Sequence, residues 1–245
     1  FDKMYTTIKN NLRDVCALIV EPIIQCAGYM RMYHHKYLEL LSEACREYNI
    51  HLIADEIAVG FGRTGTMFGF QQAKITPDII CLSKGITGGY MTLSTILTTD
   101  DIYDAFYDEY EKLNAFLHSH SYTANPIACS AANATLDIFK DKDVIKKNKI
   151  LSAHIRKCFE SLKDHPHVSD VRQKGMVLAI ELIKDKKRKV SYDWKERRGI
   201  RAYLHGLKNN VLMRPLGNVL YFMPPYVSTK KEISFVSEIM KEGVD

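Results

Sequence analysis

The sequence predicts an α/β fold, in which a mainly parallel sheet is layered with helices and is followed by a smaller C-terminal α+β domain. In the first part of the chain, short apolar runs rich in Ile and Leu alternate with helical stretches, as in a layered α/β domain. These runs lack polar alternation, which is typical of strands in a buried parallel sheet. After His165-Pro166 the chain changes to short strands around a helix. We therefore expect one domain over residues 1–142 and a smaller one over 143–245.

The elements of the first domain follow from apolar runs and spacing. The runs predict strands at residues 15–20, 50–54, 79–82 and 93–97. Apolar residues at helical spacing predict a helix over 37–48. A second helix is expected to run from Pro126 to residue 139, because Asn125 suits the N-cap and proline suits the first helical position.

The second domain is expected to open with a long helix, at residues 144–162. The remaining apolar runs predict strands at 168–171, 176–182, 211–213 and 219–222, with a helix over 197–208. This mixture of short strands and helices indicates an α+β arrangement.

Composition argues against several classes of function. With 46% hydrophobic and 26% charged residues, the 245-residue chain can bury a substantial core. No apolar stretch approaches the length of a membrane span, so no membrane association is expected. The net charge of +5 includes one dense basic cluster at residues 184–189. Because no aromatic residues interrupt this cluster, it is expected to be a solvated loop, and no nucleic-acid partner is expected.

The cysteines and histidines do not point to a metal site. The six cysteines are widely spaced, and several lie inside apolar runs. They are expected to be small buried hydrophobes in a reducing compartment, which favours the cytoplasm. His118 and His120 are close enough to share a metal, but no second ligand cluster accompanies them, so no metal is expected.

An aspartate and a lysine are the most informative functional residues. Asp55 and Lys84 each follow a predicted strand, and the carboxyl ends of strands are where open α/β sheets bind ligands. Pyridoxal phosphate chemistry requires such a pair, because the lysine forms a Schiff base and the aspartate pairs with the pyridinium nitrogen. Either residue alone is more simply explained as a charged strand end that reaches solvent. Glycines at 60, 62, 65, 85, 88 and 89 lower the weight of that explanation, since they let the backbone approach a ligand.

Six short motifs make the chain similar to a known family. They are Glu21-Pro22, Asp55-Glu56, the glycine-rich residues 60–65, Pro77-Asp78, Lys84-Gly85 and Asn125-Pro126. In order and spacing they resemble the class III pyridoxal-phosphate aminotransferases of fold type I. The resemblance covers nearly the whole chain, from about Cys16 to Tyr226.

The resemblance implies roles for residues at the cofactor. Lys84 would be the nucleophile that binds pyridoxal 5′-phosphate and the base that moves the proton during transfer. Asp55 would pair with the ring nitrogen. Ile57 lies two residues further on and would point to the same side in an extended chain, so it could pack on the ring face. An ordinary core isoleucine is an equally good reading of Ile57.

The resemblance also implies residues that act across a dimer or on the substrate. In the family, the loop at residues 118–121 reaches the neighbouring subunit, so a homodimer with shared active sites is expected. Ser121 and His120 would contact the partner's cofactor phosphate, and Ser119 would lie near the substrate. Arg214 would clamp a substrate carboxylate beside Tyr221. Without the resemblance, a surface arginine is the less favoured alternative reading of Arg214.

Three further segments, residues 28–34, 87–93 and 214–226, resemble one group within the class. Members of that group transfer an amino group from S-adenosylmethionine to 8-amino-7-oxononanoate, giving 7,8-diaminononanoate in biotin biosynthesis. Cys26 occupies the position where many glutamate-using members carry an acid, which weakly favours another donor. Two alternatives stay open. One is another class III aminotransferase, for diamines, ornithine or 4-aminobutyrate, and the other is a non-catalytic fragment.

One departure from the family concerns the phosphate of the cofactor. Family members carry a segment before the position of Phe1 that supplies further strands and a small-residue phosphate loop. No Gly/Ser-rich loop of this kind occurs here. The chain therefore looks like the C-terminal portion of such an enzyme, and residues 1–245 alone are expected to bind the cofactor poorly.

Overall fold

The computed structural model describes all 245 residues, and they divide into two compact units. The first unit comprises residues 1–23, 34–61 and 68–142. The second comprises residues 24–33, 62–67 and 143–245. The short segments 24–33 and 62–67 therefore belong with the C-terminal part of the chain.

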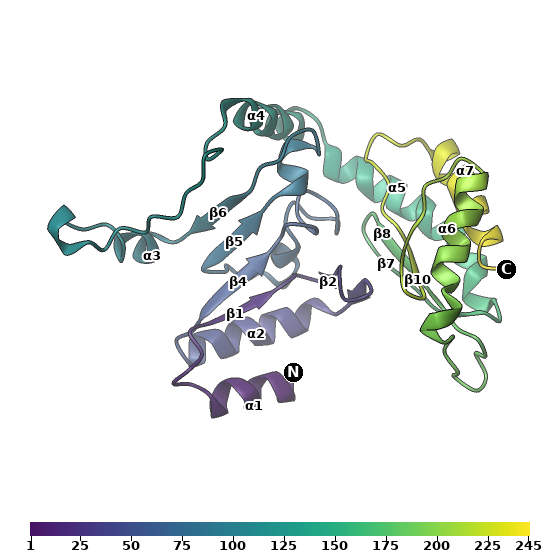
Figure 1. Ribbon diagram of the computed structural model, residues 1–245, viewed down its shortest axis with the longest axis horizontal. Coiled ribbons are helices and arrows are strands. Elements are labelled where there is room, and N and C mark those ends of the chain that lie inside the picture. Colours follow the sequence, from purple (N-terminus) through teal and green to yellow (C-terminus); the bar gives the residue numbers. More distant parts are fainter. The chain divides into compact units, whose positions relative to one another are not determined.

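The first unit is built on a four-stranded sheet in the order β1-β4-β5-β6 (Figure 1). Three neighbouring strands run parallel: β1 (Ala17–Val20), β4 (His51–Asp55) and β5 (Ile79–Leu82). The edge strand β6 (Thr95–Thr98) pairs with β5 in the antiparallel direction. The α/β class and the mainly parallel sheet that the sequence predicts are confirmed.

Some helices of the first unit begin at a side-chain cap, and others have none. They are α1 (Asp2–Asn10), α2 (His35–Glu47), α3 (Asp100–Asp104) and α4 (Pro126–Asp141), with short 3-10 helices η1 (Gly69–Ala73), η2 (Lys84–Thr87) and η3 (Tyr110–Lys112). The predicted start of α4 is confirmed. Asn125 Oδ1 accepts hydrogen bonds from the Ile127 and Ala128 amides at 3.0 and 3.3 Å, and Pro126 needs no such partner.

The two faces of this sheet differ in burial. Side chains alternate along a strand, and one set is buried, including Leu18, Leu52 and Leu82. The opposite face carries Ile19 on β1 and Ile96 on β6, which are 63% and 64% exposed. The apolar runs predicted strands of a buried parallel sheet, and in the described chain one face of that sheet is exposed at these positions. Asp55 belongs to the more exposed face, because it lies in alternation with His51 and Ile53 along β4.

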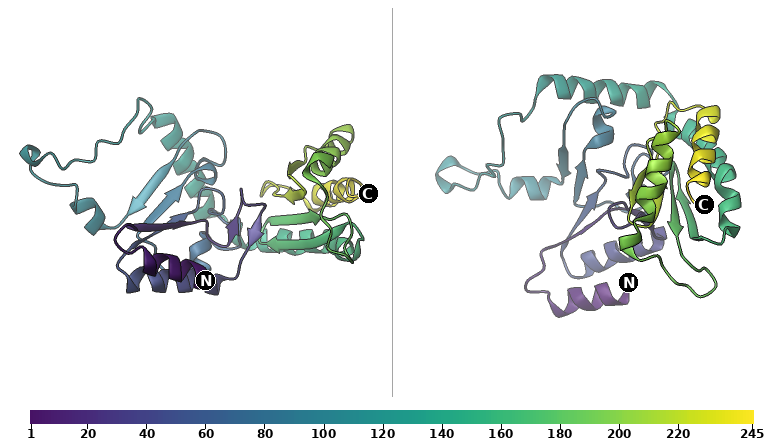
Figure 2. Two further views of the ribbon diagram at one scale, coloured as in Figure 1. Left: turned by 60° about the horizontal axis from the view of Figure 1, so that its bottom comes forward. Right: turned by 45° about the vertical axis from the view of Figure 1, so that its right-hand side comes forward.

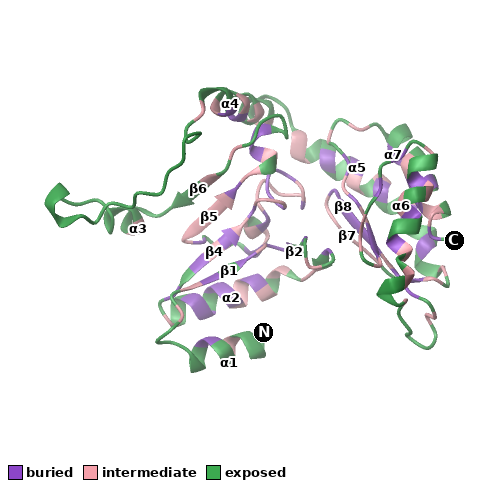
Figure 3. Cartoon of the chain, in the orientation of Figure 1, coloured by how far each residue is buried: buried purple, intermediate pink, exposed green.

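The second unit contains a four-stranded antiparallel sheet in the order β7-β8-β10-β9. Its strands are β7 (Val168–Lys174), β8 (Val177–Leu182), β9 (Arg214–Leu216) and β10 (Val219–Phe222). Its helices are α5 (Val144–Phe159), α6 (Arg198–Lys208) and α7 (Lys230–Glu242), with η4 (Glu160–Asp164), η5 (Trp194–Glu196) and a small hairpin of β2 (Ile24–Gln25) and β3 (Arg31–Met32). Figure 3 shows the buried residues of this unit on its sheet and on the inner sides of its helices.

One hydrophobic core joins this sheet to its helices. Ile155 and Phe159 from α5 and Ile233 from α7 are each at most 1% exposed within it. They pack with buried side chains from three strands and adjoining loops, including Val168, Leu178, Ile180 and Leu220. A core that draws on every layer of the unit is typical of an independently stable domain.

Two elements of the second unit differ from the sequence expectation. No strand forms at residues 211–213, because the Val211 amide donates to the Gly206 carbonyl at 2.8 Å and so belongs to the end of α6. The strand begins at Arg214 instead. Helix α7 was not expected, although its Thr229 and Glu232 form a reciprocal capping box.

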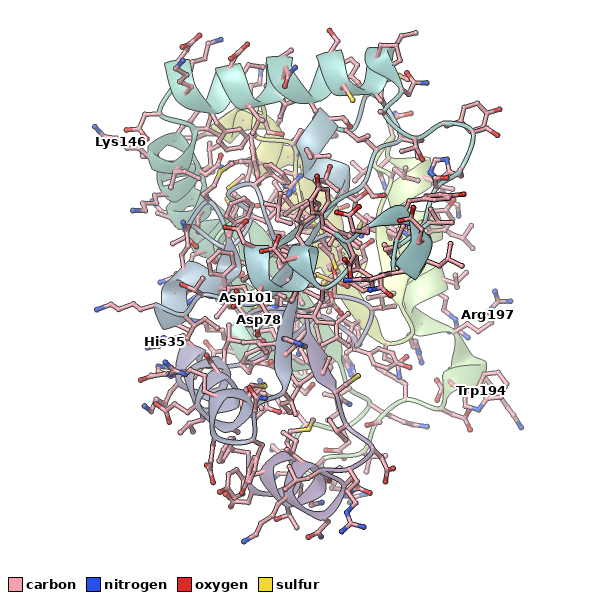
Figure 4. All side chains as sticks on the ribbon, turned by 90° about the vertical axis from the view of Figure 1, so that its left-hand side faces the viewer. His35, Asp78, Asp101, Lys146, Trp194 and Arg197 are labelled. Carbon is pink, nitrogen blue, oxygen red and sulfur yellow. The ribbon has the colours of Figure 1, made fainter.

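The basic cluster is a solvated loop, as predicted. Lys187, Arg188 and Lys189 are exposed, and the Lys184 amide donates to the Val190 carbonyl at 3.0 Å to close the loop. Trp194 and Arg197 follow it and extend outward in Figure 4. No helix in the chain is both long enough and apolar enough to cross a bilayer.

Two isoleucines of α5 test the core of the second unit. Ile155 is fully buried, whereas Ile150 on the same helix is 53% exposed. Ile155→Ala should lower the free energy of unfolding by about 2–5 kcal/mol, because it removes buried methyl groups and leaves a cavity. Ile150→Ala, the matched control, should change it by about 0.5 kcal/mol or less. Urea titrations followed by circular dichroism measure both, and equal effects of the two substitutions would contradict the packing described.

Candidate active site

Asp55 is the last residue of β4, and its carboxylate is held by the chain that follows. The Ile57 amide donates to Asp55 Oδ1 at 3.1 Å, which fixes one of the two carboxylate oxygens. The residue as a whole is half-buried. In the sheet, Asp55 lies opposite Cys81 of β5.

Lys84 follows directly after β5, at the start of η2. It lies three residues beyond Cys81, its side chain is exposed, and its φ of 46° is in the left-handed region. The preceding Ser83 hydroxyl donates to the Leu93 carbonyl at 2.7 Å, which ties this turn to the chain before β6. A non-glycine residue at positive φ is uncommon, and such strain is often found at functional sites.

Gly85 is required by the packing beside Lys84. A Cβ atom at this position would lie 2.9 Å from Cδ2 and 3.0 Å from Cβ of Phe61. Real Cβ atoms do not approach so closely, so a larger residue would displace either the Phe61 ring or the turn that carries Lys84. The glycine that the sequence places after the lysine therefore serves close packing against Phe61.

The parallel register brings Asp55 and Lys84 to one edge of the sheet. Because β4 and β5 run in the same direction, both residues emerge at the carboxyl ends of neighbouring strands. One supplies a carboxylate and the other a primary amine that reaches solvent. This pair of groups fits a ligand that carries a carbonyl group and a protonated ring nitrogen, as pyridoxal phosphate does.

Ile57 is placed differently from the sequence expectation. Residues 57–60 form a turn, closed by the Gly60 amide, which donates to the Glu56 carbonyl at 2.9 Å. The chain is therefore not extended after Asp55, and strand alternation does not determine the direction of the Ile57 side chain. Ile57 is half-buried, and its backbone amide is the group that contacts Asp55.

Glu56 is a buried acid that the sequence reasoning did not single out. It has no exposed surface, and its Oε1 accepts a hydrogen bond from the Phe70 amide at 2.9 Å. Burial raises the pKa of this carboxyl to about 7, against the opposing effect of the Gly69 and Phe70 amides. The available sequence signal was an acid adjacent to a strand-end aspartate and followed by glycines.

Residues 118–121 lie on an exposed arm of the first unit. Residues 105–124 extend away from the sheet in Figure 1 and in both views of Figure 2. His120 caps a local turn, in which its Nδ1 accepts from the Tyr122 amide at 3.1 Å. His118, Ser119, His120 and Ser121 are all exposed, and no hydrogen bond joins them to Asp55 or Lys84. Within one chain, the structure therefore does not bring this arm into the site.

Arg214 and Tyr221 lie together in the second unit. They are cross-strand partners on β9 and β10, so their side chains project from the same face. Both line a cavity of about 270 Å³ whose remaining walls are mostly apolar, among them Met213, Phe222, Ile233 and Val236. A guanidinium beside a phenol at an apolar cavity can bind a carboxylate that has an aliphatic chain.

The chain belongs to the class III aminotransferases, because the model of that family matches residues 2–244. Curated relatives carry the name adenosylmethionine-8-amino-7-oxononanoate aminotransferase. The one from Helicobacter pylori is 48% identical over 237 residues, which are 94% of this chain and 52% of the relative. The one from Geobacter sulfurreducens is 41% identical over 97% of this chain and 52% of the relative.

A solved structure shows the same fold over almost the whole chain. The crystal structure of adenosylmethionine-8-amino-7-oxononanoate aminotransferase from Methanocaldococcus jannaschii superimposes with a TM-score of 0.94 at 38% identity. The match covers 99% of this chain and 56% of that one. The chain thus spans about half the length of the relatives that it matches. The expected family and fold type are confirmed.

Proposed function

We propose that this protein is a pyridoxal 5′-phosphate-dependent aminotransferase in which Asp55 and Lys84 hold the cofactor. The observation that carries the proposal is the emergence of these two residues from neighbouring parallel strands at one edge of the sheet. When bound, the cofactor would supply a ring that accepts electrons from the substrate Cα bond. Residues 1–142 would form the C-terminal part of the large cofactor-binding domain, and residues 143–245 the small domain.

Lys84, Asp55 and Ile57 would have different roles at the cofactor. The Lys84 amine would hold the cofactor covalently and, when free, would act as the base that moves a proton during transfer. The Asp55 carboxylate would hold a proton on the ring nitrogen, with its other oxygen fixed by the Ile57 amide. The half-buried Ile57 side chain would pack against the ring.

The substrates are proposed from the relatives and from the second unit. We propose S-adenosylmethionine as amino donor and 8-amino-7-oxononanoate as acceptor, in a step of biotin biosynthesis that gives 7,8-diaminononanoate. The name of the relatives and their 41–48% identity support this choice. Arg214 and Tyr221, which lie together at an apolar cavity, would bind the carboxylate of the acceptor, and Ser119 would lie near the substrate. The absence of an acid at Cys26 agrees with a donor other than glutamate.

The exposed arm supports a homodimer with shared active sites. Large apolar side chains on the arm have little cover within the chain; Leu113 and Leu117 are 78% and 89% exposed. Large apolar side chains that gather in one exposed segment favour a protein partner. We propose that the arm packs on a second copy, where His120 and Ser121 would contact the cofactor phosphate. The six free thiols favour a reducing compartment, so we place the enzyme in the cytoplasm.

A coupled assay tests the proposed reaction. Protein made from the complete gene should convert 8-amino-7-oxononanoate to the diamine when pyridoxal phosphate and S-adenosylmethionine are present, as measured by mass spectrometry. Lys84→Ala should lower the rate by at least about a thousandfold, because it removes the nucleophile and the proton carrier together. Lys74→Ala, a lysine outside the site, is the matched control and should retain the activity.

Donor substitution separates the alternatives within the class. Faster turnover with ornithine, 4-aminobutyrate or a diamine would replace the proposed donor and keep the aminotransferase assignment. Failure with every donor, in protein that folds, would identify a non-catalytic protein and contradict the proposal.

The arm predicts how the dimer responds to mutation. Wild-type protein at micromolar concentration should have twice the chain mass by light scattering. Leu117→Glu should weaken association by about tenfold or more, because it replaces a side chain whose burial contributes about 1.5–3 kcal/mol. Leu212→Glu, at a leucine of the second unit that is 78% exposed, should leave the mass unchanged. A monomeric wild-type enzyme with full activity would contradict the shared-site arrangement.

A further inference from the structure

The acid beside Asp55 is bound to the rest of the first unit by its main chain and its side chain. The Glu56 amide donates to the Cys81 carbonyl of β5 at 3.0 Å, and the Glu56 carbonyl accepts from the Gly60 amide at 2.9 Å. Its carboxyl Oε1 accepts from the Phe70 amide at 2.9 Å. Glu56 therefore joins the end of β4 to β5, to the following turn and to η1.

The carboxyl group lies in a cradle that excludes larger residues. A Cβ atom at Gly60 would lie 2.8 Å from the Glu56 carbonyl oxygen and 3.5 Å from Oε2. A Cβ atom at Gly69 would lie 3.3 Å from Oε1 and 3.0 Å from the Cβ of Pro22. Two glycines thus lie against an acid that has no exposed surface. A space-filling role alone does not explain why the enclosed residue is an acid.

This arrangement lowers the stability of the folded state. Oε2 is buried and has no hydrogen-bond partner, and such groups are rare in folded proteins. Burial is the main reason that the pKa of Glu56 rises to about 7, and the neighbouring Asp55 carboxylate raises it further. A buried carboxyl of this kind disfavours folding increasingly as the pH rises from the ordinary pKa of a glutamic acid towards 7, because the unfolded chain ionises the group in water while the folded chain holds it neutral. A group with this cost calls for a functional reason.

The reason lies in the hydrogen bond that orients Asp55. Asp55 Oδ1 is held by the Ile57 amide, and Glu56 is the residue between the two. Because the main chain and carboxyl of Glu56 are anchored to three other segments, the position of the Ile57 amide is anchored too. Glu56, the residue after β4, has no exposed surface, whereas Asp55 is half-buried, so one side chain can be fixed in the interior while the other faces a ligand.

We propose that Glu56 is a positioning residue, which holds Asp55 in the orientation that it needs to pair with the ring nitrogen of the cofactor. This inference rests on the proposed function. It adds a residue to that function, because Glu56 would fix the orientation of Asp55 without contacting the cofactor or the substrate.

Three variants of the protein made from its complete gene separate positioning from simple stability. Glu56→Gln keeps the acceptor oxygen for Phe70 and matches the neutral acid in shape. Glu56→Met has similar length and no acceptor oxygen. Ile8→Ala, in α1, empties a buried site of the same unit and is the control for lost stability. Amide hydrogen exchange of Ile57 and Phe70 without cofactor reports the anchor, and titration with pyridoxal phosphate reports its consequence.

The expected result is a split between variants. Glu56→Gln should retain slow exchange at both amides and near wild-type affinity for the cofactor. Glu56→Met should speed the exchange of both amides. It should also lower the affinity for the cofactor by about tenfold, which is the effect of one lost hydrogen bond. Ile8→Ala should lower the denaturation midpoint without either effect. If Glu56→Met fails to fold, Glu56→Asp replaces it, because the shorter acid withdraws the oxygen from Phe70.

Two results would overturn the inference. One is an unchanged Ile57 exchange rate and cofactor affinity in Glu56→Met or Glu56→Asp. The other is a loss of affinity in Ile8→Ala as large as in the Glu56 variants, since this would trace the effect to stability. If the wild-type protein takes up no pyridoxal phosphate, the proposed function fails, and the exchange rate of the Ile57 amide alone then decides whether Glu56 anchors Asp55.

Discussion

The parallel pairing of β4 with β5 is the interaction on which the candidate active site depends. Its register sets Asp55 opposite Cys81, so the lysine three residues beyond Cys81 emerges at the same edge of the sheet as the aspartate. A slip of one residue would turn Asp55 to the opposite, buried face. Contacts after each strand then refine the positions: the Ile57 amide orients Asp55, and the packing of Phe61 on Gly85 shapes the turn at Lys84.

The sequence predicts those features of the site that are local to a strand and its end. Apolar runs located all four strands of the first sheet, and the following glycines marked the turns at Asp55 and Lys84. Helix α7 was also predictable, because the capping box of Thr229 and Glu232 is visible as a Thr-x-x-Glu pattern. The prediction of a strand at 211–213 was wrong, because the apolar residues that follow the end of α6 have the same pattern as a short strand.

The features that escaped prediction depend on contacts outside the strands themselves, some of them with residues that are distant in sequence. The role of Glu56 appears only when η1, 13 residues later, supplies the Phe70 amide to its carboxyl. The direction of Ile57 depends on a turn closed by Gly60, and extended-chain alternation gave no guide to it. The exposed face of the first sheet likewise could not be read from its strands, because β1 and β6 have apolar side chains on both sides. The apolar pattern of a strand shows which of its side chains could be buried. Which of them are buried depends on the elements that pack on each face of the sheet.

The most direct test of this site is to identify the lysine that bonds to the cofactor. Protein made from the complete gene would be loaded with pyridoxal phosphate, reduced with borohydride and digested, and the labelled peptide would be sequenced by mass spectrometry. Asp55 and Lys84 at one sheet edge predict a single stoichiometric label on Lys84. A stoichiometric label on any other lysine, or no stable label in folded protein, would contradict the assignment.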